Sequence, residues 1–395
     1  MKKDMKTILD FNFEKRTVIL RCDLNVTISD GIILDNSKIK ASLKTIEYIL
    51  DRGGKLLIMS HLGRVKTKED LSLYDMRIVY NELNKLLPGK VSFVDETNPK
   101  KLKKPLSKLE YGKAILMQNT RYEDLNGNKE SGCDLKLSKG WSKLGEFFIN
   151  DAFATSHRKH ASNFGISFYL PSGVGFLVLK EIENLNILDD PKRPFVVIMG
   201  GAKLSDKVGV IESLIKKVDY ILIGGAMSYT FLKAKGYNVG RSPVEYEKLD
   251  YCKALIDRYE EKIILPTDLY GVFSDEKDAD VIFNDINNIA DSFAGMDIGD
   301  ETIKKYISIL KNTNTVFWNG PLGVYENKNF RKGTEKILKY ITDNVDIIIL
   351  GGGDIVGCAN ILGYSDKITF SSTGGGATLK YLENHNLPGL QNMNF

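Results

Sequence analysis

The feature that most constrains this chain is a repeated alternation of short apolar runs with amphipathic segments. In the first half the apolar runs are TVILRC (17–22), KLLIMS (55–60), VSFVD (91–95), AILMQ (114–118) and FFIN (147–150). In the second half they are FVVIM (195–199), YILIG (220–224), KIILP (262–266), TVFWN (315–319), DIIIL (346–350) and KITF (367–370). Short continuous apolar runs are typical of parallel strands that are buried on both faces.

Helical periodicity fills many of the gaps between these runs. The amphipathic stretches are 36–50, 73–86, 206–217, 331–342 and 375–383. This alternation predicts an α/β fold with two doubly wound, Rossmann-like parallel sheets. A chain of 395 residues is also too long for one ordinary core, which favours two domains.

The boundary between the two domains is expected near residues 171–191. Pro171 and Gly173 interrupt the first series, and DDPKRP (189–194) opens the second. The intervening EIENLNILDD (181–190) predicts a connecting helix and a hinge. We therefore expect a first lobe over 1–172, and a linker helix with a second lobe over 173–385. The apolar run 164–179 is shorter than the ~20 residues of a membrane span and is broken by Pro171, so it is expected to be buried.

Composition narrows the class of protein. The net charge of +4 is mild, and no basic run with interleaved aromatic residues suggests a nucleic-acid partner. The four cysteines lie far apart without a CxxC pair, which argues against a zinc knuckle and a disulfide framework. The N-terminal segment lacks the apolar core of a signal peptide. These features predict a cytoplasmic protein without a membrane or nucleic-acid partner.

Polar side chains gather in the loops that follow the strands of the first half, where open α/β sheets bind ligands. Four of the seven arginines of this half and three of the chain's four histidines lie in RCDLN (21–25), SHLGR (60–64), QNTRYE (118–123) and NDAFATSHRKH (150–160). Arginine forks suit carboxylate and phosphate groups. The alternative is a metal site at HRKH, but no further ligand set completes it. The candidates are Arg21, Asp23, Asn25, His61, Arg64, Arg121, His157, Arg158 and His160.

Lys38 lies in the first turn of the helix expected over 36–50. A cation at a helix N-terminus opposes the helix dipole, so this lysine is poorly placed for helix stability. It is either a solvated surface charge or a cation aimed at a bound anion.

The loops of the second half are rich in glycine: MGGAKLSDK (199–207), GGAM (224–227), NGPLGVYE (319–326), GGGD (351–354) and STGGGA (372–377). Glycine lets the backbone approach a ligand, and helix N-termini favour phosphate, so the set favours a nucleotide. The P-loop pattern and a GxGxxG after the first strand are both absent, which disfavours a dinucleotide dehydrogenase. Lys203 and Lys207 could contact phosphates and Glu326 a ribose, whereas Asp354 is either a Mg²⁺ ligand or a helix cap.

Taken in order, RCDLNV, SHLGR, NDAFATSHRKHAS, GGAKLSDK, GGAMSYTFL, WNGPLGVYE, GGGD and STGGGATL resemble phosphoglycerate kinase across essentially the whole chain. The resemblance implies a bilobed, monomeric, cytoplasmic enzyme of glycolysis. Such an enzyme reversibly transfers the acyl phosphate of 1,3-bisphosphoglycerate to Mg-ADP, giving 3-phosphoglycerate and Mg-ATP, after hinge closure. The tail 386–395 would pack back on the N-terminal lobe.

The resemblance also implies roles for individual residues. The phosphoglycerate would be held by Asp23, Asn25, Lys38, His61, Arg64, Arg121 and Arg158. The nucleotide would be held by Gly201, Lys203, Lys207, Gly225, Asn319, Glu326, Gly351, Gly352, Gly353, Asp354 and Ile355, with Asp354 on the Mg²⁺ ion. The residues expected to act on the transferring phosphoryl group are Lys38, Lys203, Gly352 and Gly375.

Several positions depart from the family's pattern. Lys38 stands where the family has its N-lobe catalytic arginine, and Ile355 where it usually has threonine. Ala154 and Ala226 replace usual glycines, while Thr27 and Val65 replace prolines. These departures leave two alternatives to an active enzyme of this family. One is a catalytically weakened, nucleotide-binding relative with a regulatory role, and the other is a kinase for a different carboxylic acid.

Overall fold

The structure, a computed structural model, describes residues 5–274 and 280–393. The chain forms two compact units, one up to Glu183 together with the segment from Asn386, the other Asn184–His385. The sequence places the boundary earlier, at 172/173. The difference arises because β8 (Ser172–Val174) pairs with β7 (Phe147–Asp151) in the first sheet.

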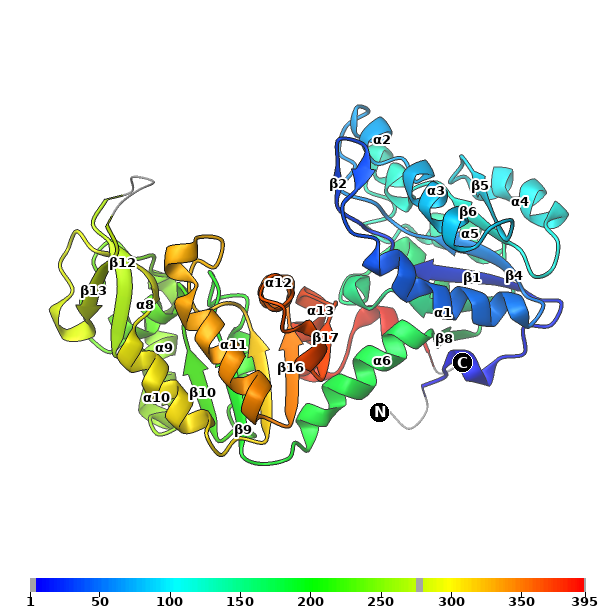
Figure 1. The fold of residues 1–395 in the computed structure, drawn as a ribbon. Helices are drawn as coiled ribbons and strands as arrows, with labels where there is room; N and C mark the ends of the chain where they lie inside the picture. Colours follow the sequence, from blue (N-terminus) through cyan, green and yellow to red (C-terminus); the bar gives the residue numbers. More distant parts are fainter. Residues whose placement is uncertain (1–4, 275–279, 394–395) are drawn as a thin grey trace. The chain divides into compact units, whose positions relative to one another are not determined.

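The first unit is built on a six-stranded parallel sheet with the order β5-β6-β4-β1-β7-β8 (Figure 1). Except for the edge strand β5, its strands are fully or largely buried, as their continuous apolar sequences predict. In addition to β7 and β8, they are β1 (Thr17–Cys22), β4 (Lys55–Met59), β5 (Val91–Val94) and β6 (Ala114–Met117).

Helices cover both faces of this sheet. They are α1 (Ser37–Asp51), α2 (Asp70–Leu73), α3 (Arg77–Leu86), α4 (Pro99–Lys108) and α5 (Leu135–Ser142), and a small hairpin joins β2 (Ile28–Ser29) to β3 (Ile32–Ile33). The helix expected over 73–86 starts later: the short helix α2 ends at Leu73, and the second helix, α3, covers the range from Arg77. The second starts where the Asp75 carboxylate accepts a hydrogen bond from the Arg77 amide, 2.7 Å away.

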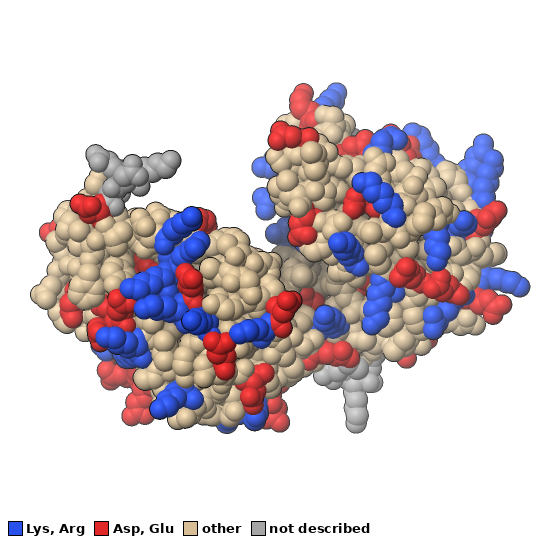
Figure 2. All heavy atoms as spheres, viewed as in Figure 1, with Lys and Arg blue, Asp and Glu red and all other residues tan. Residues whose placement is uncertain are grey.

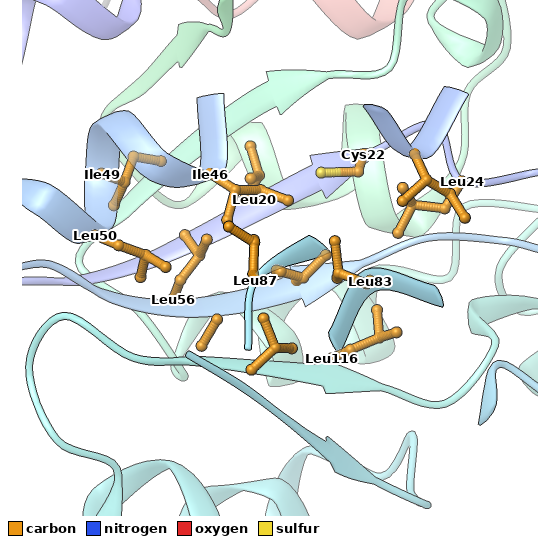
Figure 3. Packing of buried hydrophobic residues seen from close by; sticks show 14 of the residues in the cluster. Leu20, Cys22, Leu24, Ile46, Ile49, Leu50, Leu56, Leu83, Leu87 and Leu116 are labelled. Atoms are coloured by element: carbon orange, nitrogen blue, oxygen red, sulfur yellow. The ribbon is translucent and has the colours of Figure 1, made fainter. Parts of the chain in front are cut away.

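The core of the first unit lies between the sheet and the helices α1 and α3. Figure 3 shows Ile46, Ile49 and Leu50 of α1 packed over Leu20 and Leu56 of the central strands. This packing fixes α1 on the sheet, and with it the N-terminal turn that carries Lys38.

The C-terminal segment packs within the first unit. The Lys6 amide donates to the Met393 carbonyl (2.7 Å), and the Gly389 amide donates to the Ser156 carbonyl (2.8 Å). Buried Asn150, at the end of β7, donates to the Gly389 carbonyl at 2.9 Å. The segment is thus tied to the loop that follows β7.

The second unit contains a second six-stranded parallel sheet, of order β11-β10-β9-β15-β16-β17. The helix α6 (Phe176–Leu185), which begins earlier than the predicted connecting helix, leads into this unit through a 3-10 turn at Asn186–Asp189. The sheet strands are β9 (Phe195–Met199), β10 (Tyr220–Ile223), β11 (Ile263–Ile264), β15 (Thr315–Asn319), β16 (Ile347–Gly351) and β17 (Phe370–Ser372). The last strand starts later than KITF predicts, because Ser365–Lys367 forms a 3-10 turn.

A three-stranded antiparallel sheet in the second unit was not predicted. Its order is β13-β12-β14, formed by Ile282–Asp285, Asp268–Val272 and Ala294–Ile298. The helices of this unit are α7 (Val208–Leu214), α8 (Met227–Ala234), α9 (Leu249–Tyr259), α10 (Asp300–Leu310), α11 (Lys332–Asn344), α12 (Gly353–Ile361) and α13 (Gly376–Asn384).

Charged side chains lie interspersed on the face shown in Figure 2, with basic and acidic residues on both units. This mixing agrees with the small net charge of the sequence. Within the described residues, no helix is both long enough and apolar enough to span a lipid bilayer.

Candidate active site

The predicted cationic residues of the first unit meet at one edge of its sheet. Strands β6, β4, β1 and β7 are neighbours and parallel, so the loops after their carboxyl ends converge. A pocket of about 410 Å³ lies there, which we call the basic pocket. It is lined by Asp23, Asn25, Lys38, His61, Gly63, Arg64, Tyr74, Arg121, Ala154, Thr155, His157, Arg158 and His160.

Lys38 reaches this pocket from the first turn of α1 and is paired there with a carboxylate. Its Nζ lies 2.9 Å from Oδ2 of Asp23, whose side chain is buried. The Lys38 side chain is 34% exposed, so the ammonium keeps access to solvent and to the pocket. Of its two sequence-based interpretations, the structure favours the cation that faces a binding pocket.

Three arginines surround the pocket without a full set of anionic partners. Arg121 Nη1 contacts Asp124 Oδ2 at 3.2 Å and Ser131 Oγ at 2.5 Å, whereas its Nε is buried without a hydrogen-bond partner among the described residues. Arg64 and Arg158 are exposed. Although Arg158 is exposed overall, partial loss of solvent around its guanidinium lowers its pKa, and repulsion by Arg121 and Arg64 adds to the effect. Like charges held together in this way favour the binding of an anion.

Two histidines of the basic pocket, His61 and His160, lie in surroundings that disfavour the charged imidazolium. Burial holds the pKa of His61 well below its usual value, and Arg21 and Arg121 lower it further. Burial together with Arg121 lowers the pKa of His160 to about 3. No group of three or more His, Cys, Asp or Glu side chains within the described residues is arranged to hold a metal ion. The alternative of a histidine metal site therefore has no support from the geometry.

The second unit carries a glycine-rich pocket of about 560 Å³. Loops after β9, β10, β15 and β16 contribute to it, together with part of the antiparallel sheet. Its lining residues are Gly201, Ala202, Gly225, Ala226, Tyr229, Arg241, Pro243, Ala294, Gly295, Met296, Pro321, Gly323, Val324, Tyr325, Glu326 and Asp354.

Some glycines of these loops are needed for the loops themselves. A Cβ on Gly225, whose φ is +62°, would lie 2.4 Å from the Gly201 amide nitrogen, so two loops cross backbone against backbone. Gly352 has a φ of +109° at the N-cap of α12, which leaves the first amides of that helix without a side-chain cap. Such free amides suit a phosphate group.

Lys207 lies at the buried end of these loops. Its Nζ contacts the side-chain oxygen of Asn319, and the Asn319 amide group contacts the Gly351 carbonyl. Burial lowers the pKa of Lys207 to about 8, although Asp206 and Asp354 act in the opposite direction. The structure thus places Lys207 against Asn319, with Asp354 near enough to act on the charge of Lys207.

Of the predicted nucleotide residues, Gly201, Gly225, Glu326 and Asp354 line the glycine-rich pocket. Those that do not line it are Lys203, Lys207, Asn319, Gly351, Gly352, Gly353 and Ile355. The Ile355 side chain is fully buried in the core, so only its backbone at the start of α12 could contact a ligand. Lys203 is exposed and is not among the residues that line the glycine-rich pocket. Gly375, the N-cap of α13, does not line it either.

Comparison with known proteins assigns the chain to a family. The sequence profile of phosphoglycerate kinase matches residues 8–385. The chain belongs to the phosphoglycerate kinase family. It is 46% identical over 394 residues to the phosphoglycerate kinase of Enterococcus faecalis, covering 98% of this chain and 99% of that protein. It is also 46% identical over 393 residues to the enzyme of Fusobacterium nucleatum, covering 98% of each.

Solved structures of phosphoglycerate kinases have the same fold. The Coxiella burnetii structure superposes with a TM-score of 0.86 at 31% identity, and the Pyrococcus horikoshii structure with 0.84 at 30%. Each comparison covers 98% of both chains. The predicted fold class, two parallel-sheet α/β units, is confirmed.

Several lining residues of this phosphoglycerate kinase family member were not predicted. They include Tyr229 of α8, Arg241, and Gly295 and Met296 of β14. Gly295 and Met296 come from the antiparallel sheet that the sequence did not reveal, and Arg241 lies outside the quoted motifs. Tyr229 lies within GGAMSYTFL, but the sequence analysis did not single it out. Ala154 and Ala226, which replace the family's usual glycines, each add a methyl group to the wall of one pocket.

Proposed function

We propose that the protein reversibly transfers the acyl phosphate of 1,3-bisphosphoglycerate to Mg-ADP, giving 3-phosphoglycerate and Mg-ATP in glycolysis. The observation that carries this proposal is the pairing of two chemically different pockets, one in each unit. Three arginines and a lysine line the basic pocket, and glycine-rich strand ends form the other. A phosphoglycerate, which carries a carboxylate and a phosphate group, fits the first pocket, and a nucleotide fits the second.

In the basic pocket we assign the substrate to Asp23, Asn25, Lys38, His61, Arg64, Arg121 and Arg158. The Asn25 side-chain oxygen accepts from the Gly63 amide at 2.8 Å, which couples the loop after β1 to the loop after β4. Asp23 can accept a hydrogen bond from a substrate hydroxyl, while the arginines hold carboxylate and phosphate oxygens.

In the second unit we assign the nucleotide to Lys207, Asn319, Glu326, Asp354 and the glycine loops. Lys203, being exposed, can reach a phosphate from outside the pocket. Asp354 fits a Mg²⁺ ion, because it offers an exposed carboxylate at a helix start beside Glu326, and Mg²⁺ takes its other ligands from phosphates and water. When bound, that ion would neutralise charge on the phosphates.

In phosphoryl transfer, the protein mainly positions the two substrates and stabilises the charge on the transferring group. Lys38 and Lys207 supply cations to the equatorial oxygens, and no side-chain nucleophile is required. Direct transfer needs the reacting oxygens within ~3–3.5 Å, so the proposal requires the two units to close on each other during turnover. Closure would also exclude water, which could otherwise hydrolyse the acyl phosphate. We further propose a cytoplasmic monomer.

A coupled assay with pure protein tests the proposal. We expect Mg²⁺-dependent ATP formation from 1,3-bisphosphoglycerate and ADP, abolished when EDTA replaces the metal. Calorimetric binding of both 3-phosphoglycerate and ADP without turnover would contradict the proposal and favour the regulatory alternative. Turnover of another acyl phosphate in preference to 1,3-bisphosphoglycerate would favour a related kinase.

A further inference from the structure

A chain of four buried polar side chains lies beneath the basic pocket: Glu130, Ser162, Arg21 and His61. Glu130 accepts from the Ser162 hydroxyl at 2.5 Å and from the Ser162 amide at 2.9 Å. Arg21 Nε lies 2.9 Å from the same hydroxyl, and Arg21 Nη2 lies 3.2 Å from His61 Nδ1. Arg21 and Glu130 are completely buried, while His61 is 9% exposed and lines the pocket.

The directions of the hydrogen bonds that the Arg21 guanidinium makes are fixed by chemistry. A guanidinium only donates and an ionised carboxylate only accepts. The Ser162 hydroxyl therefore accepts from Arg21 and donates to Glu130, and His61 Nδ1 must accept from Arg21. Because Nδ1 accepts this hydrogen bond, it carries no proton, and the ring proton resides on Nε2.

The other ring nitrogen of His61 makes no hydrogen bond among the described residues and belongs to a side chain that lines the pocket. We propose that Glu130, Ser162 and Arg21 are positioning residues that lock His61 as the Nε2–H tautomer, which presents an N–H donor to an oxygen of the bound phosphoglycerate. The ligand part of this inference rests on the proposed function.

The lock matters because the two neutral tautomers act oppositely on an anionic ligand. The Nε2–H form offers a donor, whereas the Nδ1–H form would turn a lone pair toward the same oxygen. The lock also keeps Arg21 from the pocket, because its donors are used below it: Nη1 contacts the Cys22 carbonyl in addition to the two bonds above. Glu130 supplies the negative charge that a completely buried guanidinium requires.

The tautomer is measured directly in the free protein. The chain has only four histidines, so long-range ¹⁵N–¹H correlation spectra of ¹⁵N-histidine-labelled protein are simple, and a His61→Gln variant assigns the His61 signals. We expect the pattern of a neutral ring protonated at Nε2 at pH 7. A ring protonated at Nδ1, or an imidazolium, overturns the proposal. This readout needs no substrate, so it stands even if turnover, and with it the proposed function, fails.

Two variants then distinguish a role in positioning His61 from a purely electrostatic effect of the buried charges on anion binding. Arg21→Lys keeps the cation but loses the fork that reaches both Ser162 and His61. The Ser162 amide donates to a Glu130 oxygen and needs an acceptor there. In Glu130→Gln, the NH₂ group of the glutamine side chain can take the place of that oxygen and cannot accept this hydrogen bond. Removing a negative charge below a cationic pocket should by itself tighten the binding of an anion. The lock instead predicts, for both variants, a second tautomer in the spectra and a roughly three- to tenfold higher KM for 3-phosphoglycerate.

The matched controls are Arg16→Lys and Glu146→Gln at an exposed ion pair of the same unit, and we expect both to keep the wild-type KM. A lower KM in Glu130→Gln with an unchanged tautomer would overturn the positioning role. If a variant fails to fold, the wild-type spectrum still decides the proposal.

Discussion

Lys38 is a single ammonium that already has a partner, the buried carboxylate of Asp23 at 2.9 Å. An arginine, which the family resemblance places here, could keep one arm on Asp23 and offer the other to the phosphoryl group. We therefore expect Lys38→Arg to raise kcat by ~10- to 10³-fold. The lower limit corresponds to one additional contact in the transition state, and the upper limit to the effect of an arginine finger. A steady-state coupled assay of both proteins at saturating substrates measures this effect.

The matched control for this change is Lys40→Arg, an exposed lysine on the same helix that does not line the basic pocket. It should leave kcat unchanged. Equal rates for wild type and Lys38→Arg would mean that the ammonium already supplies everything that the reaction needs at this position.

Lys207 gives a prediction about pH. Burial lowers its pKa to about 8, so the free protein loses this cation as the pH rises through that value. Because kcat/KM reports the free enzyme, kcat/KM for Mg-ADP should fall above about pH 8. In Lys207→Arg the cation persists, so the alkaline limb should disappear even if the overall rate is lower. A limb that survives in Lys207→Arg assigns the titration to another group.

At the scale of elements, helix α6 begins on a buried carboxylate. Asp151 Oδ1 accepts from the amides of Leu177 (2.8 Å) and Val178 (3.3 Å), whereas Oδ2 has no hydrogen-bond partner among the described residues. Burial raises the pKa of Asp151 to about 6, although hydrogen bonding with Thr45 and with the Val178 and Leu177 amides favours the anion.

This pKa predicts how the stability of the first unit changes with pH. The folded state holds the Asp151 proton more tightly than the unfolded state, so the carboxylate destabilises the fold above about pH 6 and not below about pH 4. An asparagine side chain at this position could keep the cap without the charge. Asp151→Asn should therefore raise the unfolding free energy by roughly 2–3 kcal/mol at pH 8, with the gain vanishing near pH 4.

Urea unfolding at both pH values measures the effect of Asp151→Asn. The control is Asp51→Asn, an exposed carboxylate of the same unit paired with Lys90. A surface change of this kind should stay within about 0.5 kcal/mol at both pH values. A loss of stability in Asp151→Asn at pH 8 would show that the anion supports α6.

The parallel strands could be predicted because continuous apolar runs such as FVVIM and TVFWN fit few other structures. The antiparallel strands could not, because DLYGV, IFND and AGMDI mix glycines and aspartates, which strands disfavour. Their aspartates are satisfied only in three dimensions. Asp268 accepts from the Thr302 amide at the start of α10 (2.7 Å), and Asp297 from the Gly333 amide in α11 (2.8 Å).

The residues of the candidate site divide in the same way, into those that the sequence predicts and those that it does not. The loops after parallel strands carry compact motifs, so their residues, from Asp23 to Arg158 and from Lys207 to Asp354, could be named in advance. Met296 comes from β14, which no motif marks. The lock on His61 depends on Glu130 and Ser162, which are far apart in sequence and meet only in the folded unit.

At the scale of the whole molecule, each unit has its own core, its own pocket and one of the two tryptophans. Trp141 is buried in α5 and donates to the Thr97 carbonyl at 2.8 Å, in the first unit. Trp318 is buried in β15 and donates to the Gly320 carbonyl at 2.7 Å, beside the glycine-rich pocket. Trp318→Phe therefore leaves Trp141 as the fluorescent reporter of the first unit, and Trp141→Phe leaves Trp318 as the reporter of the second.

The proposed division of ligands predicts how these reporters respond. A ligand that binds only the folded state adds about 2.7 kcal/mol at a hundred times its Kd. In urea unfolding, 3-phosphoglycerate should move the Trp141 transition to higher urea more than the Trp318 transition, and Mg-ADP should do the reverse. Because each variant is compared with itself, the cost of its substitution cancels. If either ligand shifts both transitions equally, the two units unfold as one cooperative body. If 3-phosphoglycerate stabilises the second unit more and Mg-ADP the first, the two ligands bind in the opposite units to those proposed.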